Sequence, residues 1–202
     1  LYEIRDEDRS VADLHVIDST PIPVMAFRRA GFTPLFPEAM YGYCAAKNMT
    51  YFGFKLHLVV DRNGIPIHFD LTPANVADGS MSEELLSVSS VGRTVLGDKG
   101  YLSRPVQERL LDRYGISLFT PSRRNQKRRE DRRERRLLNS WRQIVEVVNA
   151  ILKTTFAVER TLAKTLSGLV SRIATKLTAL TFAIYLNKLF HREPLAIATL
   201  LA

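Results

Sequence analysis

The stretch Thr94-Val95-Leu96-Gly97-Asp98 is a short apolar run that ends in an aspartate. Its length and its β-branched residues predict a buried strand. A second run of the same design, His15-Val16-Ile17-Asp18, lies near the start of the chain. Strands that end in acids can deliver carboxylates to one spot from distant parts of a sequence. Mg²⁺ binds through a few carboxylates and takes substrate phosphate oxygens as further ligands. The two runs therefore make this chain a candidate enzyme acting on nucleic acid.

A hairpin is predicted between the two runs. Apolar side chains alternate with other types over residues 51–61, Arg62-Asn63-Gly64 is a turn signal, and residues 65–71 form the return strand. The other predicted elements are a strand at 116–120 and four helices. One helix begins at Ser80 or Ser82, and the others span 103–114, 137–158 and 165–190. An antiparallel hairpin joined to parallel strands through helical crossovers predicts an α/β fold with an RNase H-like core. In that fold a mixed central sheet carries helices on both faces.

Two prolines and an irregular segment limit the first strand. Pro21 and Pro23 cannot donate to a sheet ladder, which predicts that this strand ends near Ile17. Residues 26–50 mix glycine, proline and aromatic residues without a period, so we expect a long loop there.

The charge of the chain is concentrated in one segment. The 202 residues, 46% hydrophobic and 25% charged, are typical of one soluble domain, and the net charge of +8 favours a polyanionic partner. Residues 123–136 hold nine Lys or Arg and three acids, so 9 − 3 gives +6 of the total. Aromatic residues are absent from this segment, so phosphate binding fits better than base stacking. The candidate DNA contacts are Arg123, Arg124, Lys127 and Arg128, and the alternative is a solvated linker.

Composition also bounds the environment of the protein. Cys44 is the single cysteine, which excludes an intrachain disulfide and a multi-cysteine zinc site and suggests a reducing cytoplasm. The apolar region 166–190 contains Arg172, Lys176 and Lys188, and is expected not to span a membrane. The expected domains are the end of a missing N-terminal region at 1–13, a catalytic domain at 14–190 with the basic segment 123–136, and a tail at 191–202.

A third acid lies on the predicted helix near residues 138–158. Arg142, Glu146 and Lys153 are four and seven residues apart, which places them within about 40° and about 20° of one another around a helix axis. They form one polar stripe. Taken alone, the stripe is better explained by a solvated ion pair between Arg142 and Glu146.

Together these segments resemble the DDE transposases of bacterial insertion sequences, in the branch with a tyrosine-arginine-glutamate-lysine signature. Arg142, Glu146 and Lys153 match the last three signature residues, while Asn139 stands at the tyrosine position. The resemblance covers about residues 12–190. The other matching segments are Val16-Ile17-Asp18-Ser19, Leu96-Gly97-Asp98-Lys99-Gly100-Tyr101, Gly53-Phe54-Lys55-Leu56-His57 and Leu71-Thr72-Pro73-Ala74-Asn75-Val76.

The resemblance implies a cut-and-paste recombinase that uses two Mg²⁺ or Mn²⁺ ions. In this scheme Asp18 bridges both ions, while Asp98 and Glu146 each complete one, so the three acids are the catalytic and metal-binding residues. The enzyme would hydrolyse a phosphodiester at the element end, and the freed 3′-hydroxyl would attack target DNA. Lys153 would contact DNA phosphate, and Arg142 would contact DNA or orient Glu146. The implied partners are double-stranded element ends and target, with a homodimer in a synaptic complex, in the bacterial cytoplasm at the nucleoid.

Several alternatives stay open. Lys99 and Tyr101 are either supporting residues of the site or plain surface. His57 is either a core histidine or a ligand of the scissile phosphate, and Asp78 is expected to be a helix cap. At the level of function, the chain could be a domesticated or inactive DNA-binding descendant, or an RNase H-like nuclease. The spacing of Arg142, Glu146 and Lys153 favours the transposase.

Overall fold

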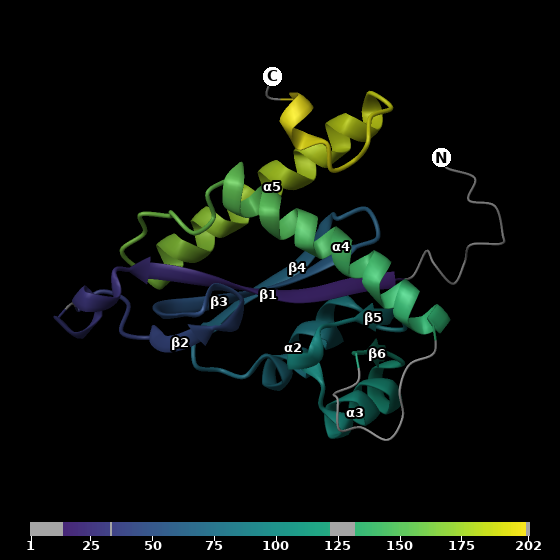
Figure 1. The fold of residues 1–202 in the computed structure, drawn as a ribbon, viewed down its shortest axis with the longest axis horizontal. Helices are drawn as coiled ribbons and strands as arrows, with labels where there is room; N and C mark the ends of the chain where they lie inside the picture. Colours follow the sequence, from purple (N-terminus) through teal and green to yellow (C-terminus); the bar gives the residue numbers. More distant parts are fainter. Residues whose placement is uncertain (1–13, 33, 122–131, 201–202) are drawn as a thin grey trace. The chain divides into compact units, whose positions relative to one another are not determined.

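A computed structural model describes residues 14–32, 34–121 and 132–200 (Figure 1). By internal packing the chain divides into two compact units, and each is described by itself. The described residues of unit 1 come from Leu1–Asp18, Val59–His68 and Asp78–Val145, and those of unit 2 from Ser19–Leu58, Phe69–Ala77 and Glu146–Ala202.

The strands form a mixed sheet in the order β2-β3-β1-β5-β6, with β4 paired to β3. Their bounds are β1 Leu14–Met25, β2 Met40–Cys44, β3 Met49–Asp61, β4 Pro66–Pro73, β5 Thr94–Leu96 and β6 Ser117–Phe119. The α-helices are α2 Asp78–Ser89, α3 Arg104–Tyr114, α4 Arg132–Thr154 and α5 Leu166–Leu189. Short 3-10 helices are η2 Phe27–Phe32, η3 Ala45–Lys47, η4 Lys99–Tyr101 and η5 Ile197–Leu200. The predicted mixed α/β class is confirmed.

Unit 1 is built on parallel pairing. β5 pairs in parallel with β1 on one side and with β6 on the other. Helices α2 and α3 cover these strands with apolar side chains, and Arg109 on α3 donates to Glu83 on α2 at 2.7 Å. The buried residues of this core are Ile17, Val59, Leu85, Leu86, Val95, Tyr101, Val106, Leu110, Ile116 and Leu118. Helix α3 ends as its sequence predicts, because Gly115 adopts the left-handed conformation with φ 65°.

Unit 2 contains the antiparallel pair β2 and β3 and the apolar helix α5. Along α5, buried side chains recur at helical spacing at Leu169, Ile173, Leu177, Leu180 and Ile184. Lys176 on α5 donates through Nζ to the carbonyl oxygens of Phe156 and Ala157, at 2.6 and 2.7 Å, just after α4 ends. Burial lowers the pKa of Lys176, and the nearby positive charge of Arg172 lowers it further.

Helix α5 is also long and apolar enough to pass a composition test for a membrane span. The core helix of a soluble protein passes the same test. In α5, 28% of the most apolar window is buried.

The structure extends the first strand beyond its predicted end. β1 continues through Pro21 and Pro23 to Met25. Within the described part of β1, the residues that pair with β5 are Leu14, His15 and Val16, so prolines farther along β1 remove no hydrogen bond to β5. The prediction that the two prolines end this strand was therefore wrong.

The predicted loop at 26–50 was wrong in part. Residues Met40–Cys44 form β2, which pairs antiparallel with β3 from Met40↔Gly53 to Cys44↔Met49. Tertiary pairing makes this segment a strand although its sequence has no clear period. Helix α2 also begins earlier than expected, at Asp78 rather than at Ser80 or Ser82.

Gly53 on β3 is a position where a side chain cannot fit. A Cβ there would collide with the carbonyl oxygen of Ile22 on β1, which is backbone and cannot swing away. We expect Gly53→Ala to lower the free energy of unfolding by about 1–3 kcal/mol, because the two strands must separate. Urea denaturation of the whole chain measures this loss. Gly31→Ala is the matched control, since a Cβ at Gly31 meets nothing within 4 Å. Equal midpoints for the two variants would contradict the prediction.

Candidate metal and catalytic site

Asp18 and Asp98 lie at the same register of two neighbouring parallel strands. The β1–β5 ladder ends at Val16↔Leu96, and Asp18 and Asp98 each follow two residues after that last pair. The backbone stays extended over this step, because Gly97 N donates to Phe119 O at 2.9 Å and Asp98 has φ −79° and ψ −177°. Neighbouring strands are about 4.8 Å apart, and residues two apart share a face. Unit 1 thus brings both half-buried aspartates to one edge of the sheet.

A tight turn fixes the carboxylate of Asp98. Its Oδ1 accepts a hydrogen bond from the backbone N–H of Gly100 at 2.7 Å, and Asp98 thereby caps the short helix η4. Tyr101, the last residue of that helix, is fully buried in the core of unit 1 and anchors the turn. The turn is closely packed, since a Cβ at Gly97 would lie 3.2 Å from Ile17 Cγ2 and from Tyr101 Cβ.

Asp78 is a further acid beside this turn. A Cβ at Gly100 would lie 2.9 Å from Asp78 Oδ2 and 2.9 Å from Asp98 Oδ1, so both carboxylates flank the same glycine. The sequence predicted Asp78 to be a helix cap, whereas the structure places it in the first turn of α2. In the sequence, Gly100 is the residue that could have indicated this neighbour of Asp98. A residue without a Cβ leaves room for two carboxylates beside it.

Glu146, the third predicted acid, belongs to unit 2. It lies exposed on α4, one turn after the half-buried Arg142 and two turns before Lys153. The predicted helical placement of this stripe is confirmed. The convergence of Glu146 with Asp18 and Asp98 stays a prediction.

The donor chemistry at the sheet edge suits a divalent cation. Across residues 14–32, 34–121 and 132–200, no group of three or more His, Cys, Asp or Glu is arranged to hold a metal ion. Asp18 and Asp98 nevertheless offer carboxylate oxygens from adjacent strands. Mg²⁺ is held in proteins by one or two carboxylates together with waters and substrate phosphates, so this pair fits such an ion.

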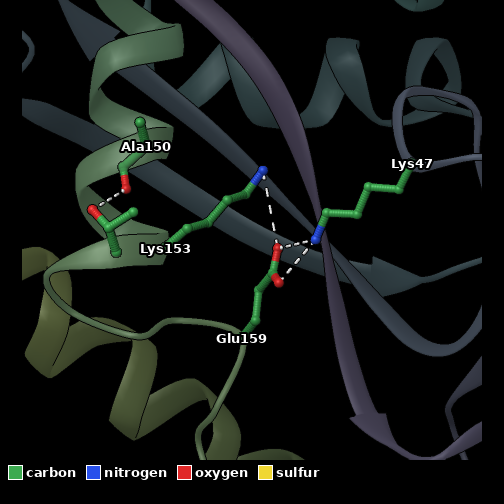
Figure 2. Close-up of polar contacts among 5 residues, drawn as sticks. Lys47, Ala150, Lys153 and Glu159 are labelled. Carbon is green, nitrogen blue, oxygen red and sulfur yellow. Dashed lines mark hydrogen bonds and ion pairs between the residues drawn. The ribbon is translucent and has the colours of Figure 1, made fainter.

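Lys153 and Lys47 share one carboxylate in unit 2 (Figure 2). Lys47 Nζ lies 2.8 Å from Glu159 Oε1, and Lys153 Nζ lies 4.0 Å from the same oxygen. Lys153 is thus available at the surface but is held close to an acid. In the next position along α4, Thr154 donates to the carbonyl of Ala150.

The remaining predicted residues separate into three groups. Lys99 is exposed, whereas Tyr101 is core. His57 is fully buried, and its Nε2 lies 2.9 Å from Thr72 Oγ1, which suits a structural histidine better than a phosphate ligand. The basic candidates Arg123, Arg124, Lys127 and Arg128 lie outside the described residues.

Comparison with known proteins bears on this arrangement. The sequence model of a protein family described as the transposase DDE domain matches residues 9–166, which is more than half of the chain. The match includes Asp18, Asp98, Glu146 and Lys153. No curated protein matches this sequence.

Proposed function

Because this chain belongs to the transposase DDE-domain family, we propose that it cleaves double-stranded DNA at the ends of a mobile element and joins the freed strand to target DNA. The mixed α/β sheet is consistent with the RNase H-like fold of such a domain. Within the family we assign the chain to the insertion-sequence branch, on the spacing of Arg142, Glu146 and Lys153.

The observation that carries the proposal is the β1–β5 register, because Asp18 and Asp98 each follow its last pair, Val16↔Leu96, by two residues. These two acids, together with Glu146, would hold two Mg²⁺ or Mn²⁺ ions. When bound, such ions stabilise the attacking and the leaving oxygens of phosphoryl transfer. The chain itself orients Asp98 through the N–H of Gly100 and supports the turn on buried Tyr101.

The helix α4 supplies the other proposed contacts. Arg142 lies one turn before Glu146 and is positioned to orient it, as i and i+4 residues are neighbours on a helix surface. Lys153 would bind a phosphate of the DNA backbone. We further propose that two copies of the chain pair in a synaptic complex and act in the bacterial cytoplasm, on nucleoid DNA.

A strand-transfer assay tests the proposal and its competitors. The substrate is a labelled duplex that carries the inverted repeats flanking the coding region, mixed with an unlabelled target plasmid. With Mg²⁺ or Mn²⁺ we expect nicked ends and joined products, and with EDTA we expect neither. Cleavage without joining would indicate an RNase H-like nuclease instead. Binding without cleavage would indicate an inactive DNA-binding descendant.

The basic segment 123–136 gives a separate prediction. If its cations neutralise backbone phosphates, replacing Arg123, Arg124, Arg128 and Arg129 with glutamine should make the salt dependence of duplex binding shallower. A plot of the logarithm of the binding constant against the logarithm of the salt concentration gives this dependence as a slope. Each lost phosphate contact should reduce the size of that slope by about 0.9. The change of Asn125 and Gln126 to serine, in the same segment, is the uncharged control. An unchanged slope in the arginine variant would identify the segment as a solvated linker.

A further inference from the structure

Three side chains of unit 2 form a small charged cluster, of which the proposed function uses only Lys153 (Figure 2). Lys47 Nζ donates to both oxygens of Glu159, at 2.8 and 2.9 Å. Lys153 Nζ lies 4.0 Å from one of those oxygens. Both ammonium groups therefore lie within 4.0 Å of the same oxygen, Glu159 Oε1. Lys47 is the last residue of η3, Lys153 lies on α4, and Glu159 lies in the segment after α4.

The cluster has an excess of positive charge at the surface. Two cations face one anion, and the side chains of Lys47, Lys153 and Glu159 are 38%, 33% and 25% exposed. Such exposed ion pairs are worth about 0–1 kcal/mol and are screened by salt. The Lys153 contact is also longer than a hydrogen bond, so its ammonium donors are not consumed by Glu159. A ligand with a stronger negative charge could replace Glu159 at little cost.

The backbone beside Lys47 is fixed by a tight turn. Asn48 adopts the left-handed conformation with φ 46°, and its N–H bonds back to the carbonyl of Ala45. Its side-chain oxygen accepts from Tyr43 Oη at 2.6 Å. This turn restricts Lys47 before any ligand binds, which lowers the entropy lost on binding.

We propose that Lys47 joins Lys153 in binding a phosphate of the DNA backbone, and that Glu159 is the counter-ion that this phosphate replaces. The inference rests on the proposed function for the identity of the polyanion as DNA. A duplex strand presents a phosphate about every 3.4 Å along its axis, so the two ammonium groups can bind one phosphate or two adjacent ones. A phosphate offers acceptor oxygens to both lysines, as the carboxylate of Glu159 does now.

Unit 1 contains a matched control of the same design. Glu83 lies between Arg109 Nε at 2.7 Å and Arg113 Nη1 at 3.8 Å. As in the first cluster, one carboxylate faces two cations, one at hydrogen-bond distance and one farther away. Arg113→Gln and Glu83→Gln therefore make the same charge changes as Lys47→Gln and Glu159→Gln, in a cluster to which we assign no DNA contact.

The test is duplex binding by the whole chain in EDTA, at a series of salt concentrations. Lys47→Gln and Lys153→Gln should each reduce the log–log slope by about 0.9. Lys47→Arg should keep the slope of the wild type, and so should Arg113→Gln. Glu159→Gln should tighten binding roughly two- to fivefold at low salt, and more than Glu83→Gln does. Thermal melts confirm that each variant is folded.

A slope for Lys47→Gln equal to that of Arg113→Gln would overturn the inference, and so would weaker binding by Glu159→Gln. Binding without divalent metal is independent of cleavage. If the element end is not cleaved but Lys47→Gln still reduces the salt-dependence slope, only the proposed catalysis is rejected. If strand transfer is active but Lys47→Gln leaves the salt-dependence slope unchanged, only the role of Lys47 is rejected.

Discussion

Replacing Asp18 with asparagine is expected to reduce DNA cleavage on the order of 10³-fold. Asp18 and Asp98 each follow the last pair of the β1–β5 ladder by two residues, so the two adjacent strands place both acids at the same end. Asparagine keeps the size of the side chain and removes its negative charge, which weakens the hold on a divalent cation. Duplex affinity should stay within about twofold, because phosphate contacts come from cations elsewhere. Gel assays of nicking with Mg²⁺, run beside binding in EDTA, measure both quantities.

The matched control is Asp112→Asn, the same change at an exposed position of α3. It should leave cleavage at the wild-type rate. Full cleavage by the Asp18 variant would remove Asp18 from the site. Equal loss of cleavage and of binding would indicate that the variant had lost its fold rather than its metal ligand.

Replacing Gly100 with alanine is expected to lower cleavage about 10²-fold, which is the typical cost of displacing a catalytic group by about 1 Å. The new Cβ would lie 2.9 Å from oxygens of both Asp78 and Asp98, so at least one carboxylate must move. Carboxylates are mobile ends of side chains, so we expect a small loss of stability beside a large loss of rate. Cleavage assays and urea denaturation on the same preparation separate the two effects.

Gly31→Ala is again the control, since it adds a Cβ in open space. A Gly100→Ala variant with wild-type cleavage would show that the position of Asp98 is not critical. Asp78→Asn in the Gly100→Ala background is a useful second variant, because it removes the charge repulsion as the acids are pushed together. It should restore part of the lost rate.

Some of the fold could be predicted from local patterns. The hairpin at Arg62-Asn63-Gly64 and the buried run Thr94–Leu96 were predicted from turn chemistry and β-branching, and both occur. The start of α3 with Pro105 in its first turn and its end at Gly115 are equally local signals. These features depend on residues close in sequence, so one sequence suffices to predict them.

The errors depend on pairing between distant segments. β2 is a strand because it pairs with β3, and Pro21 and Pro23 lie on β1 beyond the residues that pair with β5. Asp78 shows the same limit at the site, since its closeness to Gly100 arises from the packing of α2 on η4. The sequence predicts which acidic residues are candidates for the site, but it does not predict which side chains lie next to each of them.

The ladder between β1 and β5 also determines which changes of chain length the site can tolerate. Asp18 and Asp98 each lie two residues beyond the last pair of this ladder, Val16↔Leu96. Insertions in the surface turns between the two strands leave that offset unchanged. A single residue inserted between Leu96 and Asp98 would turn the second carboxylate to the opposite face of the sheet, since side chains alternate along a strand. Related sequences should therefore vary freely in the number of residues between the two acids, and hardly at all in the number of residues from each acid to the last pair of the ladder.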